Sequence, residues 1–308
     1  MIHGVVNIYK EKGFTSHDVV AKLRGIVKQK KIGHTGTLDP DAEGVLPVCF
    51  GKATKLCDML TDKDKTYETV LLLGKTTDTQ DISGEVLKEG ETQQITEERL
   101  REVIHSFEGA YAQIPPMYSA LKVNGKKLYE LAREGKEVER KARNVTIYHI
   151  KIKEIQMPRV RMEVKCSKGT YIRTLCHDIG EALGCGGCME ELLRTQVERF
   201  ELKDSIRLSE VKDLCEKGEF LSKVIPVDEM FSNYKKLTLT PEGERGVCCG
   251  NNFKIKDVSN PIEDLSFEDG ERVRVYGVKD NFIAIYEYQK AFHGFKIVKM
   301  FFDGKENS

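Results

Sequence analysis

The sequence predicts an α+β protein made of a large domain and a smaller one. Before about residue 230, segments with strand composition and segments with helical periodicity both occur. The rest of the chain shows short strand patterns separated by turn residues. At 308 residues, with 40% hydrophobic and 32% charged residues, the chain can bury an ordinary core. We therefore expect domains at residues 1–230 and 235–303.

The first expected elements are a strand at residues 5–9 and a helix that Thr15 or Ser16 caps. The apolar residues after the cap recur at helical spacing, and they are Val19, Val20, Leu23, Ile26 and Val27. From residue 19 to residue 32 there is no acidic residue, but there are five basic ones, namely Lys22, Arg24, Lys28, Lys30 and Lys31.

Residues 33–44 predict a stiff loop that presents one carboxylate, that of Asp39. Glycines 33, 36 and 44 allow backbone conformations that other residues avoid, and Pro40 disfavours helix at the residue before it. A loop of this kind can aim a side chain, so we expect the chemistry here. An ordinary acidic turn has the same composition, and the residues alone leave both interpretations open.

The middle of the chain predicts a strand at 65–73 and a helix at 96–107, where leucine, valine, isoleucine and phenylalanine share one face. Residues 109–125 contain a Pro-Pro pair and are expected to be an irregular surface excursion. Residues 122–143 alternate basic and acidic side chains, which is more typical of a solvated helical face than of a nucleic-acid patch.

A hairpin is expected from residues 145–155 and 160–166, with its turn around Pro158, followed by a helix at 174–183. After about Asp228 the pattern changes to short strands, as at 269–277 and 281–288, which indicates a small β-barrel-like module.

Composition limits the compartment and the partners. The 49 basic and 49 acidic residues cancel, so the whole-molecule field gives no argument for a polyanionic partner. The chain has no signal-peptide pattern and no apolar stretch of bilayer length. Nine scattered cysteines indicate reduced thiols, so we expect a cytoplasmic protein without membrane partners.

Other motifs are weaker. Gly51-Lys52 and Gly74-Lys75 lack the earlier glycine of a phosphate-binding loop. Cys185 and Cys188 have zinc spacing, but no second such pair completes a site, so we expect no metal. The carboxylates of Asp39, Asp41 and Glu43 could serve glycoside chemistry, although spacing along one loop does not show that they face each other.

Three segments together resemble the TruB family of tRNA pseudouridine synthases. Their order and spacing follow the family over about residues 3–230, which is far more specific than one motif. The residues past about 235 more loosely resemble a PUA-type RNA-binding module. The three segments are GHTGTLDP at 33–40 with GVLPV at 44–48, KTY at 65–67 through GKTTDTQDISG at 74–84, and SKGTYIR at 167–173.

The resemblance implies a pseudouridine synthase fold, with a central, mostly antiparallel mixed sheet flanked by helices and loops, and a small β-rich PUA-like domain. It also implies isomerisation of uridine 55 in the tRNA T-loop, with Asp39 as nucleophile. The N1–C1′ bond breaks, the uracil turns and C5 joins C1′, so the reaction requires no metal or cofactor.

The family's other site residues follow from the same resemblance. Arg173 would pair with Asp39 and keep it ionised. Tyr67 would stack on the flipped uracil and assist loss of the C5 proton, and Tyr171 and Leu192 would complete the pocket around the base. His34 would fill the vacated space, and Asp81 would support either the residues that contact the RNA or those around the arginine. From the residues alone, Leu192 would be core packing.

The partner implied is the tRNA T-arm, bound by a monomer without a guide RNA. The basic helix and the insertion at about 109–143 would contact phosphates. Two alternatives stay open: a non-catalytic tRNA-binding or folding factor would yield no isomer, and a nucleoside glycosidase would release free uracil.

Overall fold

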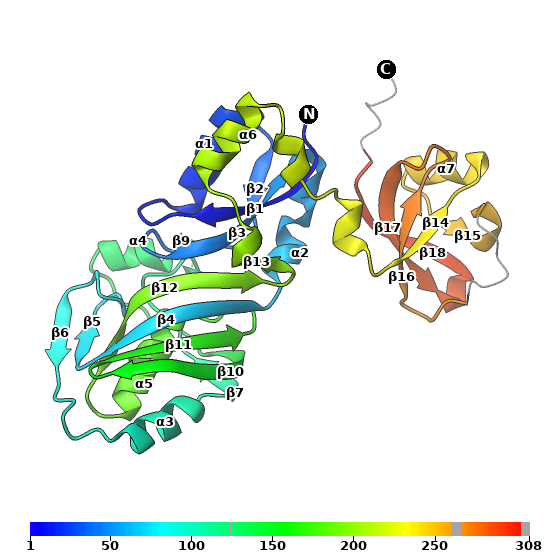
Figure 1. Ribbon diagram of the computed structural model, residues 1–308. Helices are drawn as coiled ribbons and strands as arrows, with labels where there is room; N and C mark the ends of the chain where they lie inside the picture. Colours follow the sequence, from blue (N-terminus) through cyan, green and yellow to red (C-terminus); the bar gives the residue numbers. More distant parts are fainter. Residues whose placement is uncertain (124, 260–265, 303–308) are drawn as a thin grey trace.

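The computed structural model describes residues 1–123, 125–259 and 266–302, and residues 260–265 and 303 of the expected second domain lie outside them. The expected α+β class is confirmed. One large mixed sheet with helices forms the N-terminal part, and a smaller sheet forms the C-terminal part beside it (Figure 1).

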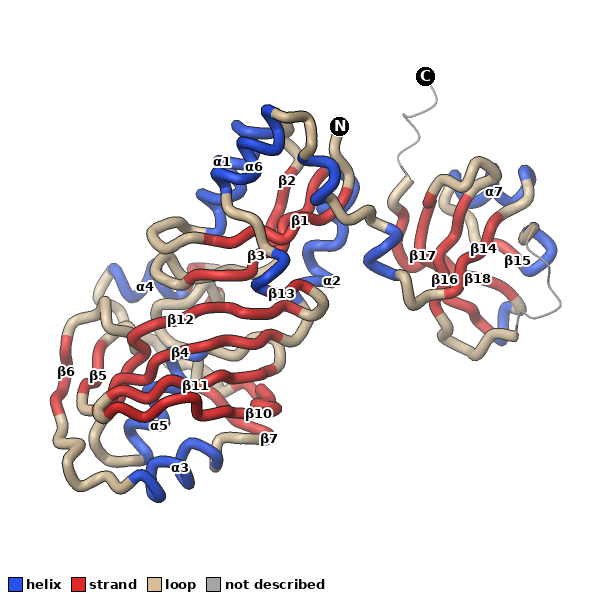
Figure 2. The backbone as a smooth tube through the Cα atoms, viewed as in Figure 1, coloured by secondary structure: helices blue, strands red, loops and turns tan. Residues whose placement is uncertain are grey.

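The large sheet has the strand order β1-β3-β12-β4-β11-β10-β7, with β2 paired to β3 and β13 paired to β12. Only β3 and β12 are parallel, so the sheet is mixed and mostly antiparallel, as expected. Figure 2 shows the long strands of this sheet side by side. Its strands are β1 (Gly4–Lys10), β2 (Ile32–His34), β3 (Glu43–Phe50), β4 (Lys65–Leu73), β7 (Gly109–Gln113), β10 (Arg143–Gln156), β11 (Arg159–Cys166), β12 (Gly187–Val197) and β13 (Phe200–Glu201).

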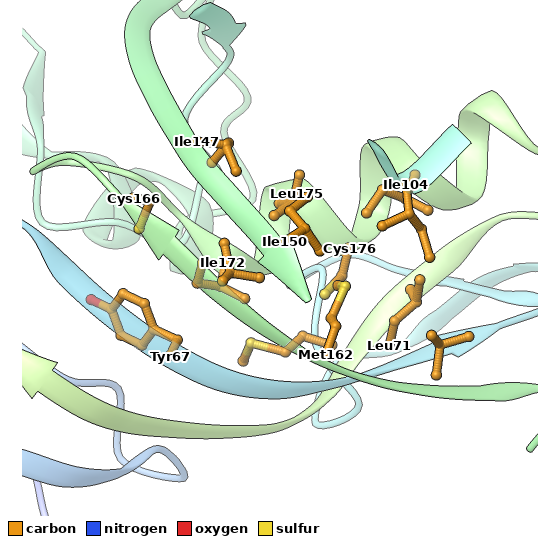
Figure 3. Packing of buried hydrophobic residues seen from close by; sticks show 14 of the residues in the cluster. Tyr67, Leu71, Ile104, Ile147, Ile150, Met162, Cys166, Ile172, Leu175 and Cys176 are labelled. Atoms are coloured by element: carbon orange, nitrogen blue, oxygen red, sulfur yellow. The ribbon is translucent and has the colours of Figure 1, made fainter. Parts of the chain in front are cut away.

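Helices cover this sheet through two separate apolar clusters. α3 and α5 pack on β4, β10 and β11, and Figure 3 shows Ile104 of α3 and Leu175 of α5 in the same cluster as Met162 of β11. α1 and α6 pack on β1 and β3. The helices of the N-terminal part are α1 (Ser16–Val27), α2 (Cys57–Thr61), α3 (Glu97–His105), α4 (Leu128–Arg133), α5 (Ile172–Ala182) and α6 (Leu208–Glu216).

Local sequence signals account for many of these elements. Thr15 caps α1 in a capping box with Asp18, which satisfies two exposed backbone donors. β4 has the expected bounds, and β10 and β11 form the expected hairpin. α5 begins at Ile172, two residues earlier than predicted, which places Arg173 in its first turn.

The prediction for residues 109–125 is wrong in its first part. Residues 109–113 form β7, which pairs with β10 at the sheet edge, although their small residues give no strand signal. The charged stretch at 122–143 is also less helical than expected: leaving out residue 124, which the structure does not describe, it holds the short strands β8 (Lys122–Val123) and β9 (Lys126–Lys127) and six residues of helix, α4. A second short hairpin, β5 (Lys75–Thr77) and β6 (Val86–Glu89), extends beyond β4.

The C-terminal sheet has the order β14-β16-β17-β18-β15 and carries one helix that the sequence patterns did not predict, α7. Ile285 and Phe301 pack in one cluster with Val45, Phe200 and Phe231, so the two parts share buried apolar surface. The elements are β14 (Lys235–Thr238), α7 (Pro241–Cys248), β15 (Phe253–Lys254), β16 (Arg272–Tyr276), β17 (Phe282–Gln289) and β18 (Gly294–Met300).

All nine cysteines are free thiols. Within the described residues, none of the helices has the length and apolar composition needed to cross a bilayer.

Candidate active site

An ion pair between Asp39 and Arg173 forms the centre of the site. Arg173 Nε lies 2.9 Å from Asp39 Oδ2, and Arg173 Nη2 donates to Asp39 Oδ1 at 3.3 Å. This two-point contact fixes the direction of the carboxylate as well as its distance. The Asp39 side chain is 40% exposed, so a ligand can reach it, whereas only 5% of Arg173 is exposed.

Besides Asp39, two further segments of the chain hold Arg173. Its Nη1 donates to the carbonyl of Thr79 at 3.0 Å, and its Nη2 donates to the carbonyl of Tyr118 at 2.9 Å. Asp81 Oδ2 lies 3.7 Å from Nη1. The insertion that carries Tyr118 therefore takes part in orienting the arginine.

The surroundings set the protonation of Asp39. Crowding by protein atoms raises its pKa above the ordinary value, and Arg173 is the main group that opposes this rise. Asp81 raises the pKa of Asp39 further, and Lys10 lowers it. Arg173 therefore favours the ionised carboxylate in a place where desolvation disfavours it.

Two tyrosines lie beside the ion pair. Tyr67 is buried in β4, and Tyr171 is half-buried at the N-terminus of α5. Burial raises the pKa of both phenols, and Asp39 is close enough to raise both further. The Gln113 side chain accepts from Tyr171 N at 2.8 Å and donates to Tyr171 O at 2.9 Å, so β7 fixes the start of α5.

His34 and Leu192 contact other residues. His34 ends β2, its imidazole makes an edge-on contact with His17 at 5.0 Å, and burial lowers its pKa. Leu192 is half-buried in β12 and packs against the cluster that contains Tyr67 and Leu38. The structure thus brings Arg173 into contact with Asp39 and Asp81 close to Arg173, and the charge of Asp39 acts on Tyr67 and Tyr171.

Gly44 ends the Asp39 loop because only glycine fits there. Its φ is +105°, and a Cβ at this position would lie 2.2 Å from the carbonyl oxygen of Arg194. The close approach of β3 and β12 therefore depends on this glycine, and that approach determines where the loop ends.

Sequence reasoning missed Lys10, whose side chain is fully buried. Its Nζ donates to the carbonyls of Ala42 at 2.5 Å, Pro40 at 3.0 Å and Glu11 at 3.2 Å. Burial lowers the pKa of Lys10 to about 8, against the opposing effect of Glu43 and Asp39. A lysine at the end of an apolar strand was the only available signal, and its role depends on contacts about thirty residues away.

We expect Lys10→Met to loosen the Asp39 loop, because the carbonyls of Pro40 and Ala42, on the C-terminal side of Asp39, lose the hydrogen bonds that Lys10 donates. The free energy of unfolding should fall by about 1–3 kcal/mol. Urea denaturation followed by circular dichroism measures this change. Lys12→Met is the matched control, because Lys12 is exposed and its replacement should leave the midpoint unchanged. Equal midpoints for the two variants would contradict a clamping role for Lys10.

The carboxylate alternatives can be compared with this geometry. The second carboxylate near this ion pair is that of Asp81, which comes from a different segment. It raises the pKa of Asp39 and lies 3.7 Å from Arg173. Glu43 instead accepts a hydrogen bond from Tyr9 at 3.1 Å. In the part of the chain that the structure describes, no three His, Cys, Asp or Glu side chains gather as metal ligands would.

Comparison with known proteins agrees with this fold. Residues 24–172 match the N-terminal domain of TruB family pseudouridylate synthases, and residues 173–232 match the C-terminal domain of tRNA pseudouridylate synthase B. The chain is 54% identical to tRNA pseudouridine synthase B of Lachnoclostridium phytofermentans, over 97% of this chain and 100% of the relative. It is 46% identical to the protein of that name from Alkaliphilus oremlandii, over 97% and 94%.

Solved structures show the same fold. A Cbf5-Nop10-Gar1 complex contains a chain that matches with a TM-score of 0.72 and 28% identity, over 97% of this chain and 85% of that one. A chain of an H/ACA RNP bound to a substrate RNA containing 2′-deoxyuridine matches with a TM-score of 0.71 and 25% identity, over 98% and 86%.

These relationships define the class of protein as a pseudouridine synthase, which is an isomerase. The chain belongs to the TruB family of pseudouridylate synthases, and the family that the three sequence motifs indicated is thereby confirmed.

Proposed function

We propose that this protein converts uridine 55 in the T-loop of tRNA to pseudouridine, with Asp39 as the nucleophile. The observation that carries the proposal is the Asp39–Arg173 ion pair, which offers an oriented, ionised carboxylate that a ligand can reach. The family and the names of its near-full-length relatives supply the reaction class and the tRNA.

The other site residues have roles consistent with this chemistry. Tyr67 stacks on the flipped uracil and assists loss of the C5 proton, and Tyr171 and Leu192 complete the pocket. His34 fills the space that the flipped nucleotide leaves, and Asp81 supports Arg173. The supporting observations are that Tyr67 and Tyr171 lie beside Asp39, and that Asp81 lies 3.7 Å from Arg173.

Exposed cations next to the site are suited to RNA phosphates. Lys22, Arg24, Lys28, Lys30 and Lys31 are all exposed on and after α1, which leads into the Asp39 loop. The insertion at about 109–143 has less positive charge available for phosphates, because acidic neighbours pair with several of its cations. Glu134, for example, pairs with Lys126 and Lys136. We infer that the α1 surface contributes more affinity than the insertion does.

The direct test is to map pseudouridine in unmodified tRNA after incubation with the purified protein alone. Pseudouridine at position 55 is the expected product, formed by a monomer without a guide RNA. Binding without any isomer would favour a tRNA-folding factor, and release of free uracil would favour a glycosidase. Either result would overturn the proposal.

Nine free thiols are consistent with a cytoplasmic location.

We also propose that residues 235–303 form a PUA-like domain that adds RNA affinity and takes no part in the chemistry. The shared apolar cluster between the two parts makes truncation an unsuitable test, because removal of Ile285 and Phe301 would expose the core. Charge changes on β18 avoid this difficulty, since they leave that cluster intact.

Replacing Lys296 and Lys299 of β18 with glutamate should raise the Kd for tRNA by about tenfold and reduce its dependence on salt. The single-turnover rate at saturating tRNA should stay unchanged. Filter binding across salt concentrations and rapid-quench kinetics measure the two quantities. The double arginine variant, which keeps both charges, should bind as the wild type does. A lower saturated rate in the glutamate variant would contradict the proposed division of roles.

A further inference from the structure

Arg194 is a buried arginine that the reaction scheme above does not use. It lies in β12 with 1% of its surface exposed. Its strand neighbours are Gly44 of β3 and Tyr67 of β4. Its Nε donates to the carbonyl of Val45 at 2.7 Å. The side chain is therefore fixed between the strand that follows the Asp39 loop and the strand that carries Tyr67.

The Arg194 guanidinium is not neutralised. Its Nη2 atom is buried without a hydrogen-bond partner, and among the described residues no carboxylate forms an ion pair with it. Its other charged neighbours are the cations Lys10 and Lys65. A buried charge without a counter-ion costs considerable free energy, which an apolar side chain of similar volume would avoid. A function in which a negative charge arrives or develops nearby would explain why the charge is kept.

The position of the guanidinium limits which group it can act on. A Cβ added to Gly36 would lie 3.9 Å from Arg194 Nη1, so the guanidinium lies next to the Asp39 loop. Its charge also acts on the Tyr67 phenol, where it opposes the effect of burial. The cation therefore lies between the tyrosine assigned to the uracil and the loop that carries the nucleophile.

Building on the proposed function, we propose that Arg194 supplies a fixed positive charge that stabilises the uracil while it is detached from the ribose. When the N1–C1′ bond breaks, its electron pair stays on N1, and the negative charge spreads to the two ring carbonyl oxygens. The C5–C1′ bond then forms, and the proton lost from C5 is balanced by one gained at N1. Arg194 exchanges no proton in this sequence. A charge already in place lowers the barrier because it needs no reorganisation during the reaction.

Arg194→Gln and Arg194→Lys test the need for the charge. The glutamine variant should lose about 10²- to 10³-fold in single-turnover rate at saturating tRNA. Its Kd should stay within about threefold of the wild-type value, because the charge acts in the transition state more than in binding. The lysine variant should recover at least about tenfold of the lost rate. Arg159→Gln is the matched control. Because Arg159 is exposed on β11, where it pairs with Glu190, the single-turnover rate of this variant should equal that of the wild type.

A second substrate separates electrostatic stabilisation from a structural role. In tRNA with 5-fluorouridine at the target position, fluorine withdraws electrons and stabilises the detached base without help from the protein. The quantity to compare is the rate of substrate consumption by the wild type divided by that of the variant. This quotient should be smaller for the fluorinated tRNA than for uridine tRNA by about tenfold or more. Equal ratios for the two substrates would overturn the role of Arg194.

Circular dichroism and thermal unfolding establish that each variant is folded. If the glutamine variant does not fold, the lysine variant decides the question. Its smaller loss of rate should also shrink with the fluorinated tRNA. An unchanged wild-type to variant ratio would overturn the inference. Absence of pseudouridine with the wild-type protein would instead overturn the proposed function. The two failures are thus distinguishable.

Discussion

Asp39→Asn should lower the single-turnover rate of pseudouridine formation by at least about 10⁴-fold. The amide keeps the size of the side chain but removes the charge that, in the proposed function, attacks the substrate or stabilises cationic character at C1′. The Asp39 side chain is 40% exposed and belongs to none of the apolar clusters, so the variant should fold, and thermal unfolding checks this. Rapid-quench assays of unmodified tRNA measure the rate, and filter binding measures the Kd.

The matched control for this change is Asp41→Asn, two residues along the same loop, where the side chain is exposed. Its rate should stay within about threefold of the wild type, since surface substitutions of this kind have small effects. The Asp39 variant should still bind tRNA, because phosphate contacts elsewhere supply the affinity. Turnover retained in Asp39→Asn would remove this residue from the nucleophile's role. An equal loss in Asp41→Asn would point to the loop as a whole.

Arg173→Gln should have the next largest effect, a loss of about 10³-fold in the saturated rate at neutral pH. The change removes the cation that faces Asp39 and leaves the carbonyls of Thr79 and Tyr118 without that donor. Each unpaired carbonyl costs about 1–3 kcal/mol of stability. Thermal unfolding must therefore accompany the kinetics, and the rate should be compared below the melting temperature of the variant.

The dependence of the rate on pH separates the electrostatic effect from the structural one. Desolvation raises the pKa of Asp39 and Arg173 lowers it, so removal of the arginine should leave that pKa higher than in the wild type. Because the active form of Asp39 is the ionised one, the acidic limb of the rate profile should move to higher pH. Arg173→Lys keeps a cation and should shift the limb less. An unshifted limb in a folded glutamine variant would show that Arg173 does not control the ionisation of Asp39.

The sequence identified most of the candidate site because its signals are local or belong to ordered motifs. Prolines and glycines around Asp39 predict a stiff loop, and the cap at Thr15 predicts where α1 begins. Strand β4, which carries Tyr67, has strand-type residues along its whole length. Each of these signals acts within a few residues of the group it positions, so it can be read along the chain.

Lys10, Arg194 and β7 could not be found in this way, because their roles come from contacts that are distant in sequence. Lys10 bonds to carbonyls about thirty residues away, and β7 becomes a strand by pairing with β10. Arg194 is buried because three strands meet around it. A charged residue inside a strand gives no sign of whether it faces solvent or the site, so the pattern alone did not select it.

The sequence by itself determined the family, the mixed α and β content, the loop that presents Asp39 and the identity of its arginine partner. The tertiary structure alone decided that these two side chains, 134 residues apart, meet in a two-point ion pair. It also decided that the insertion reaches Arg173, and that Arg194 is buried with one guanidinium nitrogen, Nη2, left without a hydrogen-bond partner. The physical reason is that periodicity and capping act over single turns and strands, whereas desolvation and charge pairing depend on which distant segments the folded sheet brings together.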